Sequence, residues 1–238
     1  MKTAIMVDGA YYQKRMAYLL GAKSPDERAE ELMRYVHRHL FDGGVQTCEL
    51  YRIFYYDCPP SEKTVFHPLT QKNVDLKKSA LYAWSKGFHN ALMNKRKVAI
   101  RLGELLESSA GYVLTSDALK RLCRNDIGVS DLTEQDFYLD IKQKGVDMRI
   151  GLDTASLAQK RLVDQIVLIA GDSDFVPAAK HARREGIDFI LDPLWQNIKP
   201  SLNEHIDGLR TRISKPPNHI SDPLYKGNKN IADDQSEN

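Results

Sequence analysis

The chain has 238 residues, 42% hydrophobic and 28% charged, with a net charge of +2. This length and composition predict one sizeable domain that buries its core without disulfides, and the small charge allows a local nucleic-acid patch without arguing for one. No apolar run approaches the roughly 18 residues of a membrane helix, so no membrane partner is expected, and the 3 cysteines favour a reducing, cytoplasmic location.

The first half of the chain predicts strands that alternate with helices. Short runs of β-branched, aromatic and apolar residues indicate strands, and apolar residues at helical spacing indicate helices. Ser24-Pro25 and Gly43-Gly44 mark the start and stop of the clearest amphipathic helix. In chain order the predicted elements are strand 2–8, helix 10–20, helix 26–41, strand 48–56, helix 72–93 and strand 97–102.

The second half begins with residues 103–141, the least readable part of the chain, where only a short helix from Ser116 to Arg124 and a turn at Asp126-Ile127-Gly128 are indicated. We expect an insertion there, acting as a lid or as a contact in a homo-oligomer. The predicted elements that follow are an extended segment 146–152, helix 152–162, strand 165–170, a helix from Ser173 or Asp174 to Glu185, strand 187–191 and helix 199–210. The domain is thus predicted to span residues 1–213, and the Pro-rich and polar residues 214–238 to form a disordered tail.

Strands that alternate with helices predict an α/β domain around a mostly parallel sheet. Right-handed crossovers then place the carboxyl ends of the parallel strands on one edge. Open α/β sheets bind their ligands at that edge. Residues that follow the strands are therefore the first candidates for a functional site.

Aspartates stand at several of these strand ends and helix starts. Asp8 ends the first strand, Asp172 and Asp174 follow strand 165–170, and Asp153 lies where helix 152–162 begins. Each is also a candidate helix N-cap, a position that aspartate fills well; Asp174 is the better cap of its pair, which leaves Asp172 without a structural role. Carboxylates gathered on one edge repel one another unless a hard cation such as Mg²⁺ or Mn²⁺ neutralises them. The pattern favours a metal-dependent site for phosphodiester chemistry.

Two further acids have weaker claims on this site. Asp147 precedes Asp153 by six residues, and we interpret it as a solvated side chain rather than an outer member of the cluster. Asp57 ends strand 48–56, but an acid before Pro59-Pro60 is typical of a turn.

Basic and aromatic side chains flank the acids. Lys142, Lys144 and Arg149 are either a solvated rim or contacts to the phosphates of a nucleic-acid backbone, which Lys and Arg dominate. Tyr11 and Tyr12 begin helix 10–20, where one ring can stack a base and the other is expected in the core.

Three segments together resemble the signature of NYN domains, which are PIN-like nucleases, and come closest to the LabA-like bacterial branch. They are Val7-Asp8-Gly9, Lys144-Gly145-Val146-Asp147 followed by Asp153, and Ala170-Gly171-Asp172-Ser173-Asp174-Phe175-Val176-Pro177. The resemblance implies a PIN-like three-layer α/β/α sandwich. It also implies that Asp8, Asp153, Asp172 and Asp174 bind Mg²⁺ or Mn²⁺ and hydrolyse RNA. Many relatives carry Asn where this chain has Tyr11, which affects how water or the phosphate is positioned.

The sequence therefore predicts a metal-dependent endoribonuclease. The alternative is a catalytically weak or inactive RNA-binding module of the same fold, for which Tyr11 is the best support. Cleavage of DNA by similar acids also stays open. A phosphatase of the haloacid dehalogenase type is disfavoured, because its second Asp would have to stand at Ala10.

Overall fold

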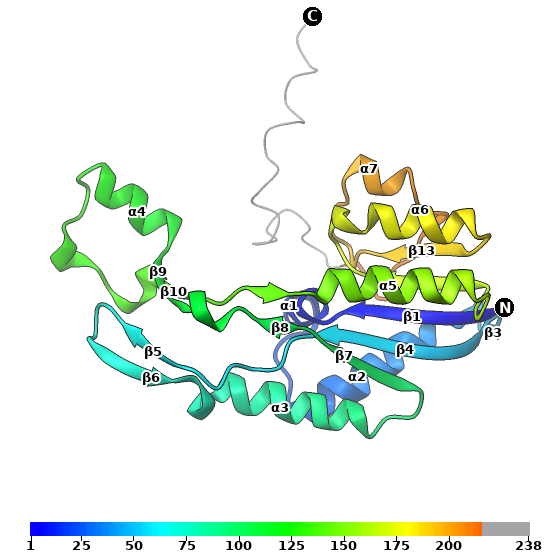
Figure 1. Cartoon of the computed structure of the whole chain (residues 1–238), viewed down its shortest axis with the longest axis horizontal. Helices are drawn as coiled ribbons and strands as arrows, with labels where there is room; N and C mark the ends of the chain where they lie inside the picture. Colours follow the sequence, from blue (N-terminus) through cyan, green and yellow to red (C-terminus); the bar gives the residue numbers. More distant parts are fainter. Residues whose placement is uncertain (216–238) are drawn as a thin grey trace, which may run out of the picture.

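The computed structural model describes residues 1–215, so the predicted tail lies outside the described residues except for positions 214 and 215. Within that part of the chain the central sheet has six strands in the order β14-β13-β12-β1-β4-β7, and every neighbouring pair is parallel (Figure 1). The strands are β1 (Lys2–Asp8), β4 (Glu49–Asp57), β7 (Val98–Leu102), β12 (Gln165–Ile169), β13 (Asp188–Asp192) and β14 (Gly208–Leu209).

Helices cover both faces of this sheet. On one face lie α1 (Gly9–Leu20), α2 (Pro25–Arg38) and α3 (Ala80–Met93), and on the other α5 (Val146–Gln159) and α6 (Val176–Arg184). Successive side chains of β1 point to opposite faces of the sheet. Ile5 and Val7 therefore pack against the first group of helices, and Ala4 and Met6 pack against the second. The predicted α/β fold, a three-layer sandwich with a parallel sheet, is confirmed.

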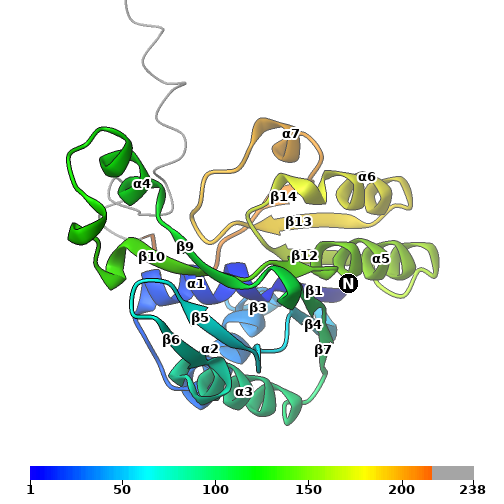
Figure 2. The ribbon, with the colours of Figure 1, turned by 60° about the vertical axis from the view of Figure 1, so that its left-hand side comes forward.

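An arm projects from the carboxyl edge of the sheet (Figures 1 and 2). We define the arm as residues 58–79 and 103–145, because strand β5 (Thr64–His67) of the first segment packs against strand β9 (Gly111–Leu114) of the second. The His67 ring lies 4.3 Å from the ring of Tyr112 and 5.3 Å from that of Phe137. The predicted insertion 103–141 thus makes up most of the larger segment of the arm, and the smaller segment, 58–79, packs against it.

The remaining elements are short. In the arm they are β6 (Lys72–Asp75), η1 (Leu76–Lys78), β8 (Glu104–Leu105), η2 (Glu107–Ser109), α4 (Ser116–Cys123), η3 (Val129–Asp131), η4 (Glu134–Asp136), β10 (Phe137–Asp140) and β11 (Gln143–Lys144). In the core they are β2 (Phe41–Asp42), β3 (Val45–Gln46), η5 (Ser173–Phe175) and α7 (Pro200–Asn203).

The structure differs from the predicted elements in three places. Helix 72–93 is in fact strand β6, the 3₁₀ turn η1 and then α3, which begins at Ala80 with Ser79 as its N-cap. Helix 199–210 is the short α7 followed by β14, which adds the last strand to the sheet. The extended segment 146–152 and helix 152–162 are a single helix, α5.

No helix of the described residues is both long enough and apolar enough to cross a membrane.

Candidate active site

Five aspartates meet at the carboxyl edge of the sheet. Asp8 and Asp57 end the adjacent strands β1 and β4, and Asp172 follows β12, which pairs with the other side of β1. Asp147 enters from the first turn of α5. The negative charges of Asp147, Asp57 and Asp172 repel the charge of Asp8. In the same way, the charges of Asp172 and Asp174 repel that of Asp147. We call these five residues the acidic cluster.

Asp8 lies at the centre of the acidic cluster. Its Oδ1 accepts a hydrogen bond of 3.1 Å from the Tyr11 amide, so it caps α1 as well. Burial is the main reason why the pKa of Asp8 is raised to about 6; the amide bond opposes this, and the charges of Asp147, Asp57 and Asp172 add to it. A carboxylate in such surroundings is costly to ionise, and a cation removes that cost.

Asp147 is exposed, as predicted, but its charge also acts on the other acids of the cluster, which the prediction did not include. Gly145 precedes α5 with φ of +80°, a left-handed conformation that glycine adopts without strain, and the chain then turns into the helix. The Asp147 side chain therefore starts the helix at the edge where β1 and β12 end. Partial burial, followed by the charges of Asp172 and Asp174, raises the pKa of Asp147.

The turn after β12 holds the last two acids. Oδ1 of Asp172 accepts a hydrogen bond of 3.2 Å from the Asp174 amide, so Asp172 is the cap of η5, and the prediction that Asp174 fills this role was wrong. Asp174 is exposed. Nζ of Lys199 donates to Oγ of Ser173 over 3.0 Å and brings a positive charge beside the two acids. No pattern in the sequence pointed to Lys199.

Asp153 lies away from the cluster. It sits in the middle of α5 and not at a helix start, about 1.7 turns further along the helix than Asp147. Its Oδ2 accepts hydrogen bonds from the Tyr56 hydroxyl over 2.9 Å and from Arg101 Nε over 3.1 Å. The structure thus joins Asp8, Asp172 and Asp174 of the predicted set, and gives Asp153 other partners.

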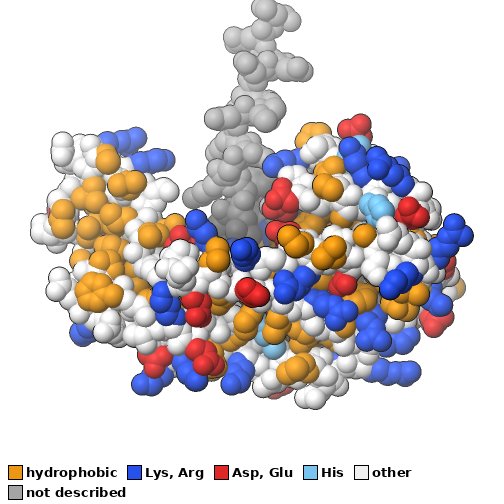
Figure 3. Space-filling view, in the orientation of Figure 1, with side chains coloured by type: hydrophobic (Ala, Val, Ile, Leu, Met, Phe, Trp, Pro, Cys, Tyr) orange, Lys and Arg blue, Asp and Glu red, His pale blue; other side chains and the backbone are white. Residues whose placement is uncertain are grey.

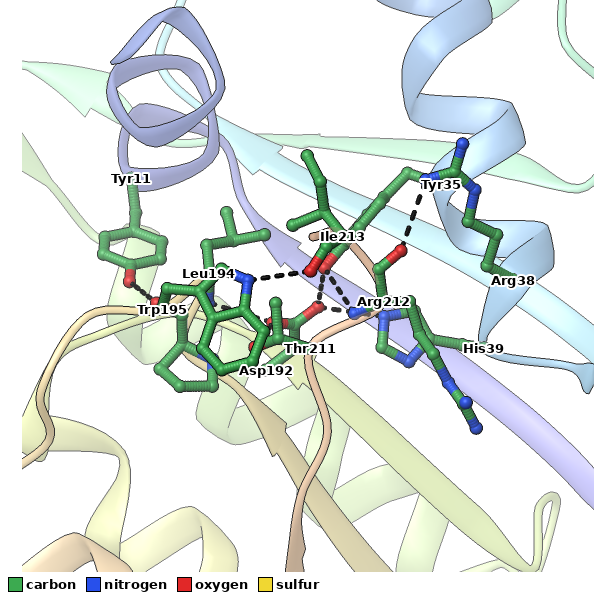
Figure 4. Close-up of polar contacts among 11 residues, drawn as sticks. Tyr11, Tyr35, Arg38, His39, Asp192, Leu194, Trp195, Thr211, Arg212 and Ile213 are labelled. Carbon is green, nitrogen blue, oxygen red and sulfur yellow. Dashed lines mark hydrogen bonds and ion pairs between the residues drawn. The ribbon is translucent and has the colours of Figure 1, made fainter. Parts of the chain in front are cut away.

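Tyr11 is fixed across the edge of the site (Figure 4). Its hydroxyl donates to the carbonyl of Pro193 over 2.5 Å, and its ring lies on Gly171, where a Cβ would stand only 2.4 Å from Tyr11 Cε2. Tyr12 is fully buried, which confirms that one of the two rings lies in the core, whereas Tyr11 is half-buried rather than exposed.

The three residues of the predicted basic rim have different environments in the structure. Lys142 and Lys144 are exposed at the base of the arm, directly before α5. Arg149 instead folds back and donates to the Gly145 carbonyl over 3.0 Å. Figure 3 shows further Lys and Arg side chains spread over the core on the side of α5 and α6, while hydrophobic side chains gather on the arm around α4.

A buried aspartate that the sequence did not reveal lies beside the site (Figure 4). Asp192 ends β13 and is 0% exposed. Its carboxylate accepts hydrogen bonds from the Tyr35 hydroxyl, from the Thr211 hydroxyl over 2.8 Å and from the Leu194 amide over 2.9 Å, and lies 2.9 Å from His39 Nε2. Burial and Asp192 raise the pKa of Tyr35 far above its usual value, so this hydroxyl remains a donor. Asp192 therefore joins α2 to the segment that follows β14.

The carboxylate oxygens of the cluster suit a hard divalent cation. As the side chains stand in residues 1–215, no group of three or more His, Cys, Asp or Glu is arranged to hold a metal ion by itself. Mg²⁺ is usually bound through one or two carboxylates, several waters and the phosphates of the substrate. Asp8, Asp147 and Asp172, with Asp174 beside them, fit a site of that kind.

The raised pKa of Asp8 predicts how stability depends on pH without metal. The folded state holds the proton up to about pH 6, while the unfolded chain loses it near 3.8. Because the folded state binds the proton more tightly, this contribution to stability is present below pH 3.8 and is lost as pH rises towards 6, by roughly 2–3 kcal/mol.

Urea denaturation in EDTA at pH values from 4 to 7 measures this loss. Asp8→Asn is the reference, because Asn keeps the cap and has no titrating proton. We expect the stability of the wild type to fall relative to Asp8→Asn as pH rises. Parallel profiles for the two proteins would show that Asp8 titrates as an ordinary carboxylate.

A model of one protein family matches the chain: NYN domain, over residues 2–202. The match is to the family as a whole. A search of curated proteins and a search of solved structures each gave no match.

Proposed function

Because the chain belongs to the NYN domain family, a family of PIN-like nucleases, we propose that it is a metal-dependent endoribonuclease that hydrolyses RNA phosphodiester bonds. Mg²⁺ or Mn²⁺ is the proposed cofactor and RNA the proposed partner. Assignment to the LabA-like branch, on the resemblance around Gly171-Asp172-Ser173-Asp174, is part of the proposal. So is a cytoplasmic setting.

One observation carries this proposal: Asp8 is surrounded by the charges of Asp147, Asp57 and Asp172 at the ligand-binding edge of the sheet. Capping accounts for Asp8 and Asp172 one at a time, but repulsion among four neighbouring carboxylates lowers the stability of the fold unless a cation offsets it. Perturbed carboxylates of this kind concentrate at functional sites. A bound cation that also contacts a substrate phosphate would offset the repulsion between these carboxylates.

The chain's own residues have the following proposed roles. Asp8, Asp147 and Asp172 would hold the ion, so Asp147 takes the place that the sequence assigned to Asp153. Asp174 would accept a hydrogen bond from water. When bound, the ion supplies a more acidic water and offsets the charge that builds on the phosphate oxygens. Lys199, beside Ser173, is placed to attract the RNA backbone.

The test is incubation of the purified protein with single-stranded RNA in Mn²⁺, in Mg²⁺ and in EDTA. We expect internal cleavage with either metal and none in EDTA. Matched DNA strands distinguish an RNA from a DNA substrate.

The second candidate, a non-catalytic RNA-binding module, is supported by the fixed ring of Tyr11 at the site. RNA that is bound but left intact in both metals would favour that candidate.

The exposed Lys142 and Lys144 give a separate prediction about binding. Replacing both by Ala should weaken RNA binding for every sequence and reduce the slope of log K against log salt, by about 0.7 for each lost phosphate contact with a single strand. Fluorescence anisotropy at several salt concentrations in EDTA measures the slope. The matched control is Lys2→Ala with Lys160→Ala at the opposite edge of the sheet, for which the slope should not change. An unchanged slope in the Lys142/Lys144 variant would place the RNA path elsewhere.

A further inference from the structure

A cavity of about 370 Å³ opens next to the acidic cluster, between the core and the arm. Asp57 of the cluster lines it, and so does Ala10, two residues after Asp8. The volume falls within the range of about 300–1,000 Å³ typical of small-ligand sites. None of the roles proposed for the acids involves this cavity.

The walls of the cavity are mainly apolar and aromatic. The loop after β4 contributes Pro59 and Pro60, the start of α3 contributes Leu81, Tyr82 and Trp84, and the arm contributes Leu105, Leu139 and Ile141. Polar side chains are few and lie among these walls: Gln13, Lys14, Ser61, Ser79, Ser85 and Gln143. An apolar site with a few polar groups suits a flat heteroaromatic ring.

The aromatic walls are held in place before anything binds. Trp84 donates its Nε1 proton to the Lys23 carbonyl over 2.8 Å, and its ring stacks on Phe88 with centroids 5.2 Å apart. The Tyr82 hydroxyl donates to Glu62 over 2.5 Å. Leu81, by contrast, is 70% exposed although it lines the cavity. A preformed site loses little side-chain entropy when it is filled.

We propose that this cavity binds the base of a nucleotide next to the scissile phosphate, and that the substrate is therefore single-stranded RNA. This inference rests on the proposed function. A phosphate at the acidic cluster leaves the adjoining nucleotide at the mouth of the cavity, because Asp57 belongs to both. Lys14, which lines the cavity and is exposed, adds a positive charge for the backbone. A base inside a duplex is stacked and paired, and must leave the helix before it can enter.

The first experiment moves one abasic nucleotide along a single-stranded RNA around the cleavage position. At one position kcat/KM for the wild type should fall by about tenfold or more, the scale of a lost base–aromatic contact. Ser85→Phe, which fills the cavity, should cut the intact RNA as slowly as the wild type cuts the abasic one, with little further loss on the abasic RNA. Pairing the same position with a complementary strand should slow cleavage by a similar factor.

The matched control is Ala83→Phe, on the same helix but exposed and outside the cavity; it should behave as wild type. If Ser85→Phe does not fold, Leu81→Ala removes an exposed wall instead and should raise KM for intact RNA only. Equal rates for every abasic position, or a folded Ser85→Phe that cuts intact RNA at the wild-type rate, would overturn the proposal.

A second experiment is independent of cleavage. Nucleoside 5′-monophosphates are titrated in EDTA against the tryptophan fluorescence of the wild type, Ala83→Phe and Ser85→Phe. We expect a saturable change in the first two and its loss in the third. If the wild type cuts no RNA in either metal, the proposed function fails but this binding still supports the cavity. If no monophosphate changes the fluorescence, the base site is rejected whether or not RNA is cut.

Discussion

Asp147→Asn should abolish RNA cleavage, whereas Asp153→Asn should leave most of it. Asp147 shares the field of Asp172 and Asp174 and contributes to the raised pKa of Asp8. Loss of a group that merely supports a metal ligand costs about 10–100-fold, so loss of the metal ligand proposed at Asp147 should lower kcat by about a hundredfold or more. Asp8→Asn should have an effect of the same size. Single-turnover cleavage in Mn²⁺ measures both.

Asp153→Asn is the matched control, because it is the same substitution on the same helix. It weakens the contacts with Tyr56 and Arg101, which should cost about 1 kcal/mol of stability and little activity. Thermal melting with and without Mn²⁺ separates the two roles: the metal should stabilise the wild type and Asp153→Asn, but stabilise Asp147→Asn much less. An inactive Asp153→Asn protein that folds normally, beside an active Asp147→Asn protein, would return the metal role to Asp153.

Asp192→Ala should lower the free energy of unfolding by several kcal/mol, since a buried polar group left without its hydrogen-bond partner costs about 1–3 kcal/mol. The substitution leaves His39 and the hydroxyls of Tyr35 and Thr211 without their acceptor in the protein interior. It also unties α2 from the segment after β14. Urea denaturation at pH 7 measures the loss.

The control for Asp192→Ala is Asp42→Ala in the same neighbourhood. Asp42 pairs with Arg212 over 3.2 Å, but its side chain is 72% exposed, so its removal should cost less than about 1 kcal/mol. RNA cleavage per folded molecule should survive Asp192→Ala at low temperature, since Asp192 is absent from the acidic cluster. Equal unfolding midpoints for the two variants would mean that the buried hydrogen bonds of Asp192 add no more to the free energy of unfolding than the exposed pair of Asp42 does.

The sequence predicted the core strands because local signals there agree with the final packing. The strand 48–56 became β4 (Glu49–Asp57), and Ser24 caps α2 as expected, since Ser24 and Glu27 each bond the other's amide. The two acidic strand ends, Asp8 and Asp172, lie on one edge because β1 and β12 are parallel neighbours. Periodicity and capping are properties of a few adjacent residues, so sequence carries them well.

The error at α5 has a clear physical origin. Met148 and Leu152 are apolar, so residues 146–152 alternate like a strand, yet in the structure Met148 is 70% and Leu152 is 63% exposed. The buried residues are Val146 and Ile150, four apart, as in a helix. Two surface hydrophobics thus shifted the predicted helix start by six residues, from Val146 to Leu152, and made Asp153 look like the acid at the helix start, where Asp147 in fact stands.

Other features could not be predicted because their partners are distant in sequence. Asp192 ends a strand as Asp8 does, but its donors come from α2 and from Thr211, and nothing local shows that they surround it. The cavity beside Asp57 is likewise closed by α3 and by arm residues such as Leu139. Both depend on how segments meet after folding.

Strand β1 is made first but lies in the middle of the sheet, and one of its two partners is made late. Thr3 pairs with Gln165, which follows 162 residues later, so a ribosome adding about 5–20 residues per second needs roughly 8–30 seconds to supply β12. Asp147 and Asp172 arrive in the same late stretch. Three of the five acids of the cluster therefore join Asp8 and Asp57 only after most of the domain has been synthesised, so the complete cluster cannot form before β12 is available.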